Sequence, residues 1–242
     1  MPLLETHALT RKFPGVVALD HVDFAAEGGE VHAVCGANGA GKSTLMNVLS
    51  GTIPPSSGSI AIAGAAVSLD TPAAARAAGV SIVYQEFSSI PELTVADNVF
   101  LGREFRGAFG RVDRARALNE TSALLERYGI ALEPGRLVGE LGVADRQLVE
   151  LARALSTDAR ILILDEPTAV LSISEQDKLF AVIRALRERG LLVLYISHRL
   201  EEIFAIADRV SVMRDGRLVA TRDKASLTQA ELVRLMTGRE VA

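Results

Sequence analysis

The sequence contains no tryptophan, three tyrosines and a single cysteine. With one cysteine, the chain can form neither an internal disulfide nor a metal cluster held by cysteine thiolates. Cys35 ends the apolar run VHAVC, a setting that favours a buried structural thiol. The cysteine content therefore excludes internal disulfide bonds as a source of stability.

Long apolar runs and a leader segment are also missing. The longest apolar runs, Ile161–Leu164 and Leu191–Ile196, are far below the roughly 20 residues that a membrane-spanning helix needs. The first residues, MPLLETHALTRKF, contain no apolar stretch between a basic start and a small-residue cleavage site, so we expect no secretory leader. We expect a chain that does not span a bilayer and lies in the cytoplasm.

Neither sign of charge dominates. Lys and Arg number 26 against 30 Asp and Glu, and the net charge of −4 gives no general reason to expect a nucleic-acid ligand. Apolar residues make up 49% and charged residues 23%, which excludes a disordered or collagen-like chain. A length of 242 residues suits one sizeable domain and is too short for two large ones.

The first 86 residues predict an antiparallel β lobe followed by the first part of a core. Short alternating segments at 3–9 and 17–24 are separated by turn residues, as in paired antiparallel strands. Val31–Cys35 is typical of a buried strand, and residues 59–69 predict a hairpin.

The remainder of the chain predicts a helical lobe at residues 87–158 and a return to the core at residues 159–242. Strand signals vanish from residue 94 to about 157, where 113–128 and 146–155 show the spacing of amphipathic helices. Two continuous apolar strands then flank a helix at about 174–189, the pattern of a parallel sheet covered on both faces. The predicted fold class is α/β, with a mostly parallel sheet.

A glycine-rich loop lies between the strand Val31–Cys35 and the helix that follows it. Gly36–Ser43 reads GANGAGKS, which matches the eight-residue P-loop pattern in the required strand-to-helix context. Glycines let successive backbone N–H groups turn toward a phosphate, and the helix N-terminus adds partial positive charge. Lys42 is expected to reach the β- and γ-phosphates and Ser43 to bind Mg²⁺. The predicted nucleotide-binding residues here are Gly36, Ala37, Asn38, Gly39, Ala40, Gly41, Lys42, Ser43 and Thr44.

Two acids and a histidine follow later strands. Asp165 and Glu166 come where the run ILIL stops, a placement that suits Mg²⁺-assisted phosphoryl transfer. Asp165 would hold the ion, and Glu166 would orient and deprotonate the attacking water. His198 follows the strand LLVLYIS, where an imidazole could contact the γ-phosphate, although a lone histidine is more often structural.

Taken in order, five motifs resemble the nucleotide-binding domain of ABC transporters over nearly the whole chain. They are GANGAGKST, Tyr84-Gln85-Glu86, LGVADRQLVELARAL, ILILDEPT and Ile196-Ser197-His198. The resemblance implies one ABC ATPase domain over 1–242, with a P-loop NTPase core, an N-terminal antiparallel β lobe and a helical lobe. Further stretches look most like the N-terminal half of tandem ATPase subunits from ribose- and galactose-type importers. The chain would then be half of a longer protein or a separately encoded half.

The resemblance also implies roles for single residues. Phe13 matches the aromatic residue that stacks on adenine, with a core aromatic beside a Pro-Gly turn as the alternative. Gln85 matches the glutamine that senses Mg²⁺ and couples to the membrane subunit, and His198 matches the switch histidine. Catalysis would rest on Glu166, His198 and Gln85, and the metal would be held by Ser43, Gln85 and Asp165.

The signature motif departs from the LSGGQ pattern of this family. The aligned residues are Leu141, Gly142, Val143, Ala144 and Asp145. Gly142 lacks the serine hydroxyl that would donate to a γ-phosphate, and Ala144 adds a methyl where the backbone would approach it. Ser172 replaces the usual aspartate of the D-loop. Because the family pairs head to tail, we expect these changes to affect the partner's phosphate site.

The function implied by the resemblance is that of an ATP-binding and ATP-hydrolysing subunit of a sugar importer. ATP would close a pair of such domains, and hydrolysis would reopen it and drive a permease. The expected partners are membrane permease subunits, a second ABC ATPase domain, and indirectly a sugar-binding protein, with the chain on the inner face of the membrane. Residues 85–101 would meet the permease through Phe87, Ile90 and Leu93, unless these three anchor the helical lobe.

Two other functions remain open from sequence. One is an ABC ATPase that acts in DNA repair or on ribosomes, which the net charge of −4 and the lack of basic linkers disfavour. The other is a regulatory half that binds ATP with impaired hydrolysis, as the altered signature suggests; Glu166 and His198 argue against it.

Overall fold

The computed structural model describes residues 1–107 and 110–238. In chain order the strands are β1 (Leu4–Phe13), β2 (Val16–Ala26), β3 (Val31–Cys35), β4 (Ser57–Ile62), β5 (Ala65–Val67), β6 (Val80–Val83), β7 (Ile161–Asp165), β8 (Leu192–Ile196), β9 (Arg209–Arg214) and β10 (Arg217–Asp223). The α-helices are α1 (Lys42–Leu49), α2 (Pro72–Ala77), α3 (Val95–Val99), α4 (Arg114–Tyr128), α5 (Val143–Leu155), α6 (Ile173–Glu188), α7 (Leu200–Ile206) and α8 (Gln229–Thr237). Short 3₁₀ turns lie at Val138–Glu140 and Lys224–Ser226.

The strands form two sheets. The first is antiparallel, in the order β2-β1-β4-β5, and contains the hairpins expected within the first 69 residues. The second has six strands in the order β10-β9-β3-β8-β7-β6. In this sheet β3, β6, β7, β8 and β9 run parallel and β10 runs antiparallel to β9. The prediction of a mostly parallel sheet is confirmed.

The parallel sheet is covered on both faces, because alternate residues of its strands join different parts of the core. Ile161 and Ile163 of β7 pack with α1 and the antiparallel sheet, whereas Leu162 and Leu164 pack with α5 and α6. Helix α1 therefore lies between the two sheets and fills the space with Leu45 and other apolar side chains. A third cluster joins α7 and α8 to β3 and β9.

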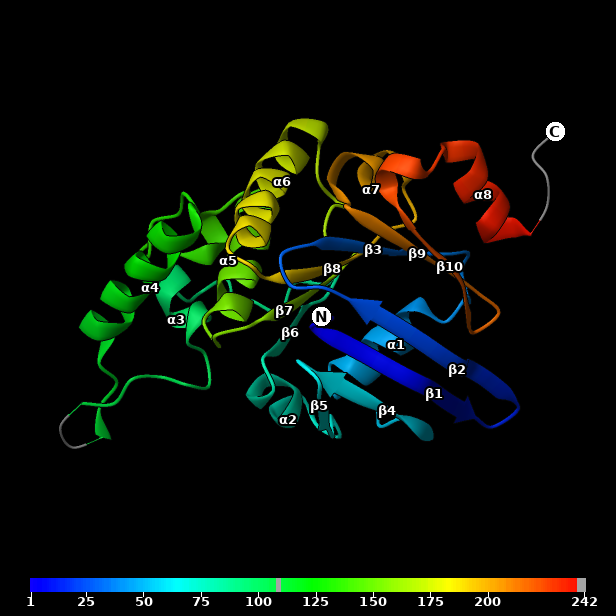
Figure 1. The fold of residues 1–242 in the computed structure, drawn as a ribbon. Helices are drawn as coiled ribbons and strands as arrows, with labels where there is room; N and C mark the ends of the chain where they lie inside the picture. The colour runs from blue at the N-terminus through cyan, green and yellow to red at the C-terminus, as the bar shows by residue number, and fades with distance from the viewer. Residues whose placement is uncertain (108–109, 239–242) are drawn as a thin grey trace.

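The helices α3, α4 and α5 form a separate group between β6 and β7 in the chain. Figure 1 shows them at one end of the molecule, with the two sheets in the middle and α8 at the other end. Helix α4 begins after the Asp113 cap, as expected, but α5 begins at Val143 instead of near Arg146. In the part of the chain that the structure describes, no helix is long and apolar enough to cross a membrane.

Polar side chains hold the loop after β6 to this helical group. The buried Glu150 of α5 accepts from the backbone N–H groups of Ser88 and Ser89, at 3.0 and 2.7 Å. The fully buried Asn98 accepts from the Ile90 N–H at 2.7 Å and donates to the Ile90 carbonyl at 3.0 Å. The segment that follows Gln85 is thus tied to both α3 and α5.

Candidate nucleotide-binding site

The predicted phosphate loop turns between β3 and α1 in a shape that requires glycine at two positions. Gly36 has a φ of +156°, and a Cβ there would lie 2.2 Å from the carbonyl oxygen of Met213. Gly41, which caps α1, has a φ of +102°, and a Cβ there would lie 2.7 Å from the carbonyl oxygen of Ala18. Side chains cannot fit at such distances, so the loop packs tightly on β2 and β9.

Lys42 lies beneath this loop and is 7% exposed. Its Nζ atom donates to the carbonyl oxygens of Gly36, at 2.8 Å, and Ala37, at 3.1 Å. Burial lowers the pKa of Lys42, while the charges of Glu166 and Asp165 act in the opposite direction. The ammonium group has three N–H donors and uses two of them on the loop, which leaves one for a further acceptor.

A cleft of about 580 Å³ opens above Lys42. It is lined by Val16, Val17, Ala18, Asn38, Gly39, Ala40, Gly41, Lys42, Ser43, Thr44, Asp165, Glu166, Ile196, Asp215 and Gly216. The structure thus brings seven of the predicted loop residues together with both predicted acids. A volume of this size lies within the usual range for small-molecule sites.

The side walls of this cleft come from residues that the sequence did not single out. Val16 and Val17 of β2 are 59% and 47% exposed, so two adjacent apolar residues at a strand start were the available signal. Asp215 and Gly216 form the tight turn between β9 and β10. Nothing in the sequence of that turn points to the cleft.

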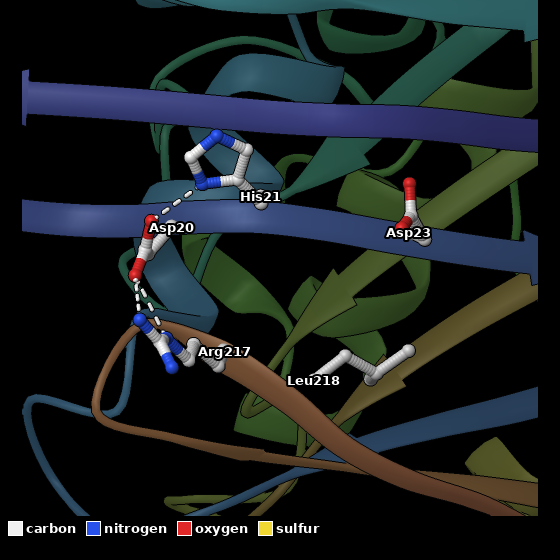
Figure 2. Close-up of a pocket in the computed structure, with 5 residues that line it drawn as sticks. All are labelled: Asp20, His21, Asp23, Arg217 and Leu218. Carbon is white, nitrogen blue, oxygen red and sulfur yellow. Dashed lines mark hydrogen bonds and ion pairs between the residues drawn. The ribbon is translucent and has the colours of Figure 1, made fainter.

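The β9–β10 turn is hydrogen-bonded to the phosphate loop and to β2. The Gly216 N–H donates to the carbonyl of Ala40 at 3.1 Å, and its carbonyl accepts from the Asp20 N–H at 2.8 Å. Asp20 also accepts from Arg217 at 2.7 Å and lies 2.7 Å from the His21 ring (Figure 2). These side chains line a second hollow of about 410 Å³. The turn therefore fastens β2 to the phosphate loop.

The two predicted acids stand at the end of β7. Burial and the neighbouring Glu166 raise the pKa of Asp165, and Lys42 opposes them. Glu166 has a φ of +46°, an unfavourable conformation for a side-chain-bearing residue, and its N–H donates to the Ile196 carbonyl at 3.0 Å. This bond to β8 holds the strained backbone in place and thereby fixes the position of Glu166.

The structure places His198 beside Glu166. Its Nδ1 atom lies 2.8 Å from Glu166 Oε1, and its side chain is 57% exposed. His198 does not line the cleft, but Glu166, which it contacts, does. A carboxylate with a histidine at hydrogen-bond distance, beside a phosphate loop, is an arrangement suited to general base chemistry.

Phe13 and Gln85 lie outside the cleft lining. Phe13 ends β1, pairs with Val16 and is 39% exposed, which does not support the core-aromatic alternative. The guanidinium of Arg11 lies 4.7 Å from the centre of its ring. Gln85 is exposed on the loop after β6, at the sheet edge that also bears Asp165.

The five signature residues surround the start of α5, and the cleft lining does not include them. Gly142 and Val143 are exposed, and a Cβ built on Gly142 meets nothing within 4 Å. Ala144 differs from the expectation: it is 7% exposed and its methyl belongs to the core of the helical group. The methyl therefore fills space inside the chain instead of standing over an incoming phosphate.

Ser172, which stands in place of the D-loop aspartate, is the residue just before α6 and caps its N-terminus. Its N–H and its hydroxyl both donate to Glu175 Oε2, at 2.8 and 2.6 Å. These bonds and the Ala144 N–H lower the pKa of Glu175. Ser172 is thus a helix-capping residue here.

Comparison with known proteins decides the family. The sequence profile described as ABC transporter matches residues 19–169. The chain belongs to the ABC transporter family. The predicted resemblance and the α/β ABC ATPase fold are both confirmed.

Relatives within this family cover nearly all of the chain. A ribose import ATP-binding protein of Rubrobacter xylanophilus is 53% identical over 240 residues, which make up 99% of this chain and 48% of that protein. A ribose import ATP-binding protein of Rhodococcus jostii is 47% identical over 241 residues, or 100% of this chain and 48% of that protein. The chain spans about half the length of the curated relatives that it matches.

Solved structures of ABC transporter components agree with the fold. A nucleotide-free ATP-binding cassette has a TM-score of 0.83 at 26% identity, and the ADP conformation of another has 0.85 at 26%. In both cases the match covers 99% of this chain and 100% of the other.

Proposed function

We propose that this chain binds and hydrolyses ATP as one ABC ATPase domain of an importer, and that the importer carries a sugar. The observation that carries the proposal is the cleft in which Lys42 lies below a glycine-rich loop and beside the Glu166–His198 pair. The names of the relatives, which are ribose import ATP-binding proteins, support a sugar as cargo. They do not favour DNA repair, ribosome binding or a regulatory half.

The phosphates of ATP would lie against the loop residues 36–44. Backbone N–H groups at the start of α1 and the ammonium of Lys42 supply the positive charge that these phosphates need. Adenine would lie toward the β1–β2 hairpin, where Val16, Val17 and Phe13 offer exposed apolar surface. The exposed ring of Phe13 would stack on the base.

The donor set beside the phosphate loop fits Mg²⁺. The Ser43 hydroxyl and the Asp165 carboxylate both line the cleft and offer the oxygen ligands that this ion prefers. We propose that Gln85, on the loop after β6, is the third ligand of the ion. When bound, the ion neutralises charge on the transferring phosphoryl group.

Hydrolysis would depend on Glu166 as the general base. Its carboxylate would accept the proton of the attacking water, and His198 Nδ1, 2.8 Å from Oε1, would hold the carboxylate in position. His198 would also contact the γ-phosphate. The bond from the Glu166 N–H to Ile196 fixes the backbone while this occurs.

The membrane partners are proposed from the family. We propose that the chain lies on the inner face of the membrane, bound to permease subunits through residues 85–101, with a second ABC ATPase domain as its pair. Of the three expected contacts, Phe87 and Ile90 are both 37% exposed and can contact a partner, whereas Leu93 is half-buried. The signature residues 141–145 would complete the partner's phosphate site, and a sugar-binding protein would deliver the cargo.

Two measurements test this function. ATP turnover of the full chain should fall by on the order of 100-fold or more in Glu166→Gln while ATP binding persists, because the amide cannot accept the proton. An unchanged rate would remove Glu166 from the mechanism.

Gentle affinity purification of the chain from the membranes of its source should recover a multi-span permease. Recovery of ribosomal or DNA-repair proteins without a permease would contradict the importer.

A further inference from the structure

A buried carboxylate is bonded to residues on both loops that carry the Glu166–His198 pair. Glu202, in the first turn of α7, is 2% exposed, whereas its neighbour Glu201 is exposed. Acids are common in the first turn of a helix, where they face water as Glu201 does. Burial of Glu202 in the same turn is costly unless every part of its charge is compensated.

The compensation comes from three hydroxyl groups on one oxygen. Glu202 Oε2 accepts from Thr168 at 2.7 Å, from Tyr195 at 2.9 Å and from Ser197 at 2.9 Å. The other oxygen, Oε1, is buried and accepts no hydrogen bond from the described residues, and its charge is balanced by the Arg199 guanidinium, whose Nη1 lies 2.6 Å away. Burial raises the pKa of Tyr195, so its hydroxyl keeps the proton that it donates.

Apart from Tyr195 of β8, these partners lie on the two loops that carry Glu166 and His198. Thr168 is two residues after Glu166, and Ser197 and Arg199 stand on either side of His198. Ser197 Oγ also accepts from the Arg199 N–H at 3.0 Å, which closes the turn around the histidine. One carboxylate thus binds the loop of the base and both flanks of the histidine.

We propose that Glu202 is a positioning residue that sets the distance between Glu166 and His198. It does not line the cleft and touches neither reacting atom, so it acts through Thr168, Ser197 and Arg199. If the carboxylate is lost, the two loops have no common acceptor and can separate. This inference rests on the proposed ATP hydrolysis for its kinetic effect, but its geometric effect is independent of turnover.

The variants can be matched closely. Glu202→Gln keeps the volume and removes the charge, and Glu201→Gln makes the same change on the exposed neighbour. Ser197→Ala and Thr168→Val each remove one buried hydroxyl from a reacting loop. Tyr195→Phe removes another buried hydroxyl that donates to the same Glu202 oxygen. Tyr195 lies in β8, outside the two loops that carry Glu166 and His198, so this variant is the matched control.

The kinetic test compares kcat with the dissociation constant for ATP. Glu202→Gln, Ser197→Ala and Thr168→Val should lower kcat by about 10- to 100-fold, the cost of misplacing a catalytic group, and leave ATP affinity within about twofold. Glu201→Gln and Tyr195→Phe should leave kcat within about twofold. Added to His198→Ala, Glu202→Gln should cause little further loss, because both act on one pair.

The structural test needs no turnover. The nitrogen chemical shifts of the His198 ring report its contact with Glu166, and they should change in Glu202→Gln and Ser197→Ala but not in Tyr195→Phe. Unchanged shifts and unchanged kcat in Glu202→Gln, with the fold intact by circular dichroism, would overturn the inference. Equal losses in Tyr195→Phe and Ser197→Ala would also overturn it, because they indicate a purely structural carboxylate. If the unaltered chain fails to hydrolyse ATP, the proposed function fails and the shifts still decide the role of Glu202.

Discussion

His198 Nδ1 lies 2.8 Å from Glu166 Oε1, although 32 positions separate the two residues in the chain. The contact follows from the register of two parallel strands, in which Asp165 of β7 stands opposite Ile196 of β8. Each residue of the pair follows its strand end by one or two positions. Strand register therefore creates the contact, and the bonds around it give it a fixed length.

Lys42→Ala should abolish ATP binding. The substitution removes the buried cation of the cleft and the two bonds that Nζ makes to the loop carbonyls of Gly36 and Ala37. Isothermal titration calorimetry should give no measurable binding, while Lys178→Ala, on the exposed face of α6, should bind as the unaltered chain does. Micromolar affinity in Lys42→Ala would contradict the assignment of the phosphate loop.

Asp165→Asn should stabilise the chain at neutral pH. Because the folded-state pKa of Asp165 is raised, by burial first and by Glu166 second, its ionised form destabilises the fold. Stability from this group is fully present below the unfolded-state pKa and is lost as the pH rises through the folded-state pKa. The thermal unfolding midpoint of the variant should exceed that of the unaltered chain at pH 7.5.

The same reasoning gives the pH trend. The advantage of Asp165→Asn should shrink as the pH is lowered, since the native carboxyl then takes up its proton. Thermal melts at intervals of one pH unit would show this. An advantage that grows toward acid pH would mean that the pKa of Asp165 is lowered in the folded state.

Gly142→Ser should be accepted without strain. A Cβ at Gly142 meets nothing within 4 Å, and the φ of −66° suits any residue. If the chain pairs with itself, the new hydroxyl can donate to the partner's γ-phosphate and raise ATP turnover by about tenfold, the value of a hydrogen bond to a charged group. Gly142→Ala is the control, because it adds the Cβ without the hydroxyl. Equal rates in a demonstrated homodimer would contradict the proposed partner-site role.

Cys35 should resist thiol reagents in the folded chain. Burial raises the pKa of its thiol to about 12, so only about one molecule in ten thousand is a thiolate at pH 8. Its Sγ lies 3.6 Å from the Ser211 carbonyl inside the core. Labelling with a maleimide should be slow in buffer and fast in urea. Fast labelling of the folded chain would show that β3 opens to solvent.

The site was predictable where its residues are consecutive in the chain. Gly36–Ser43 form a continuous loop, and Asp165 and Glu166 follow an obvious strand, so spacing alone identified them. The walls were not predicted, because Val16 at the start of β2 and Gly216 in the β9–β10 turn meet the loop only through the packing of two sheets. Glu202 was missed for a similar reason: two adjacent glutamates in a helix give no sign of which one is buried.

The fold shows the same limit. Apolar runs predicted β3, β7 and β8 because a strand buried on both faces leaves little room for polar residues. The start of α5 was misplaced by three residues, since Val143 and Ala144 precede the regular helical spacing and only packing shows that Ala144 faces the core. The methyl of Ala144 was misjudged because family alignment places a residue without telling which way its side chain points.

The β9–β10 turn makes the motifs insufficient by themselves. A fragment limited to residues 19–169, the region that the family profile matches, would keep the whole glycine-rich loop, Asp165 and Glu166. It would lose Gly216, whose N–H holds the Ala40 carbonyl, and Met213, against which Gly36 packs. Such a fragment would carry the complete glycine-rich loop and both acids and still lack the scaffold that shapes the loop. In this molecule, possession of the motif and possession of the pocket are separate properties.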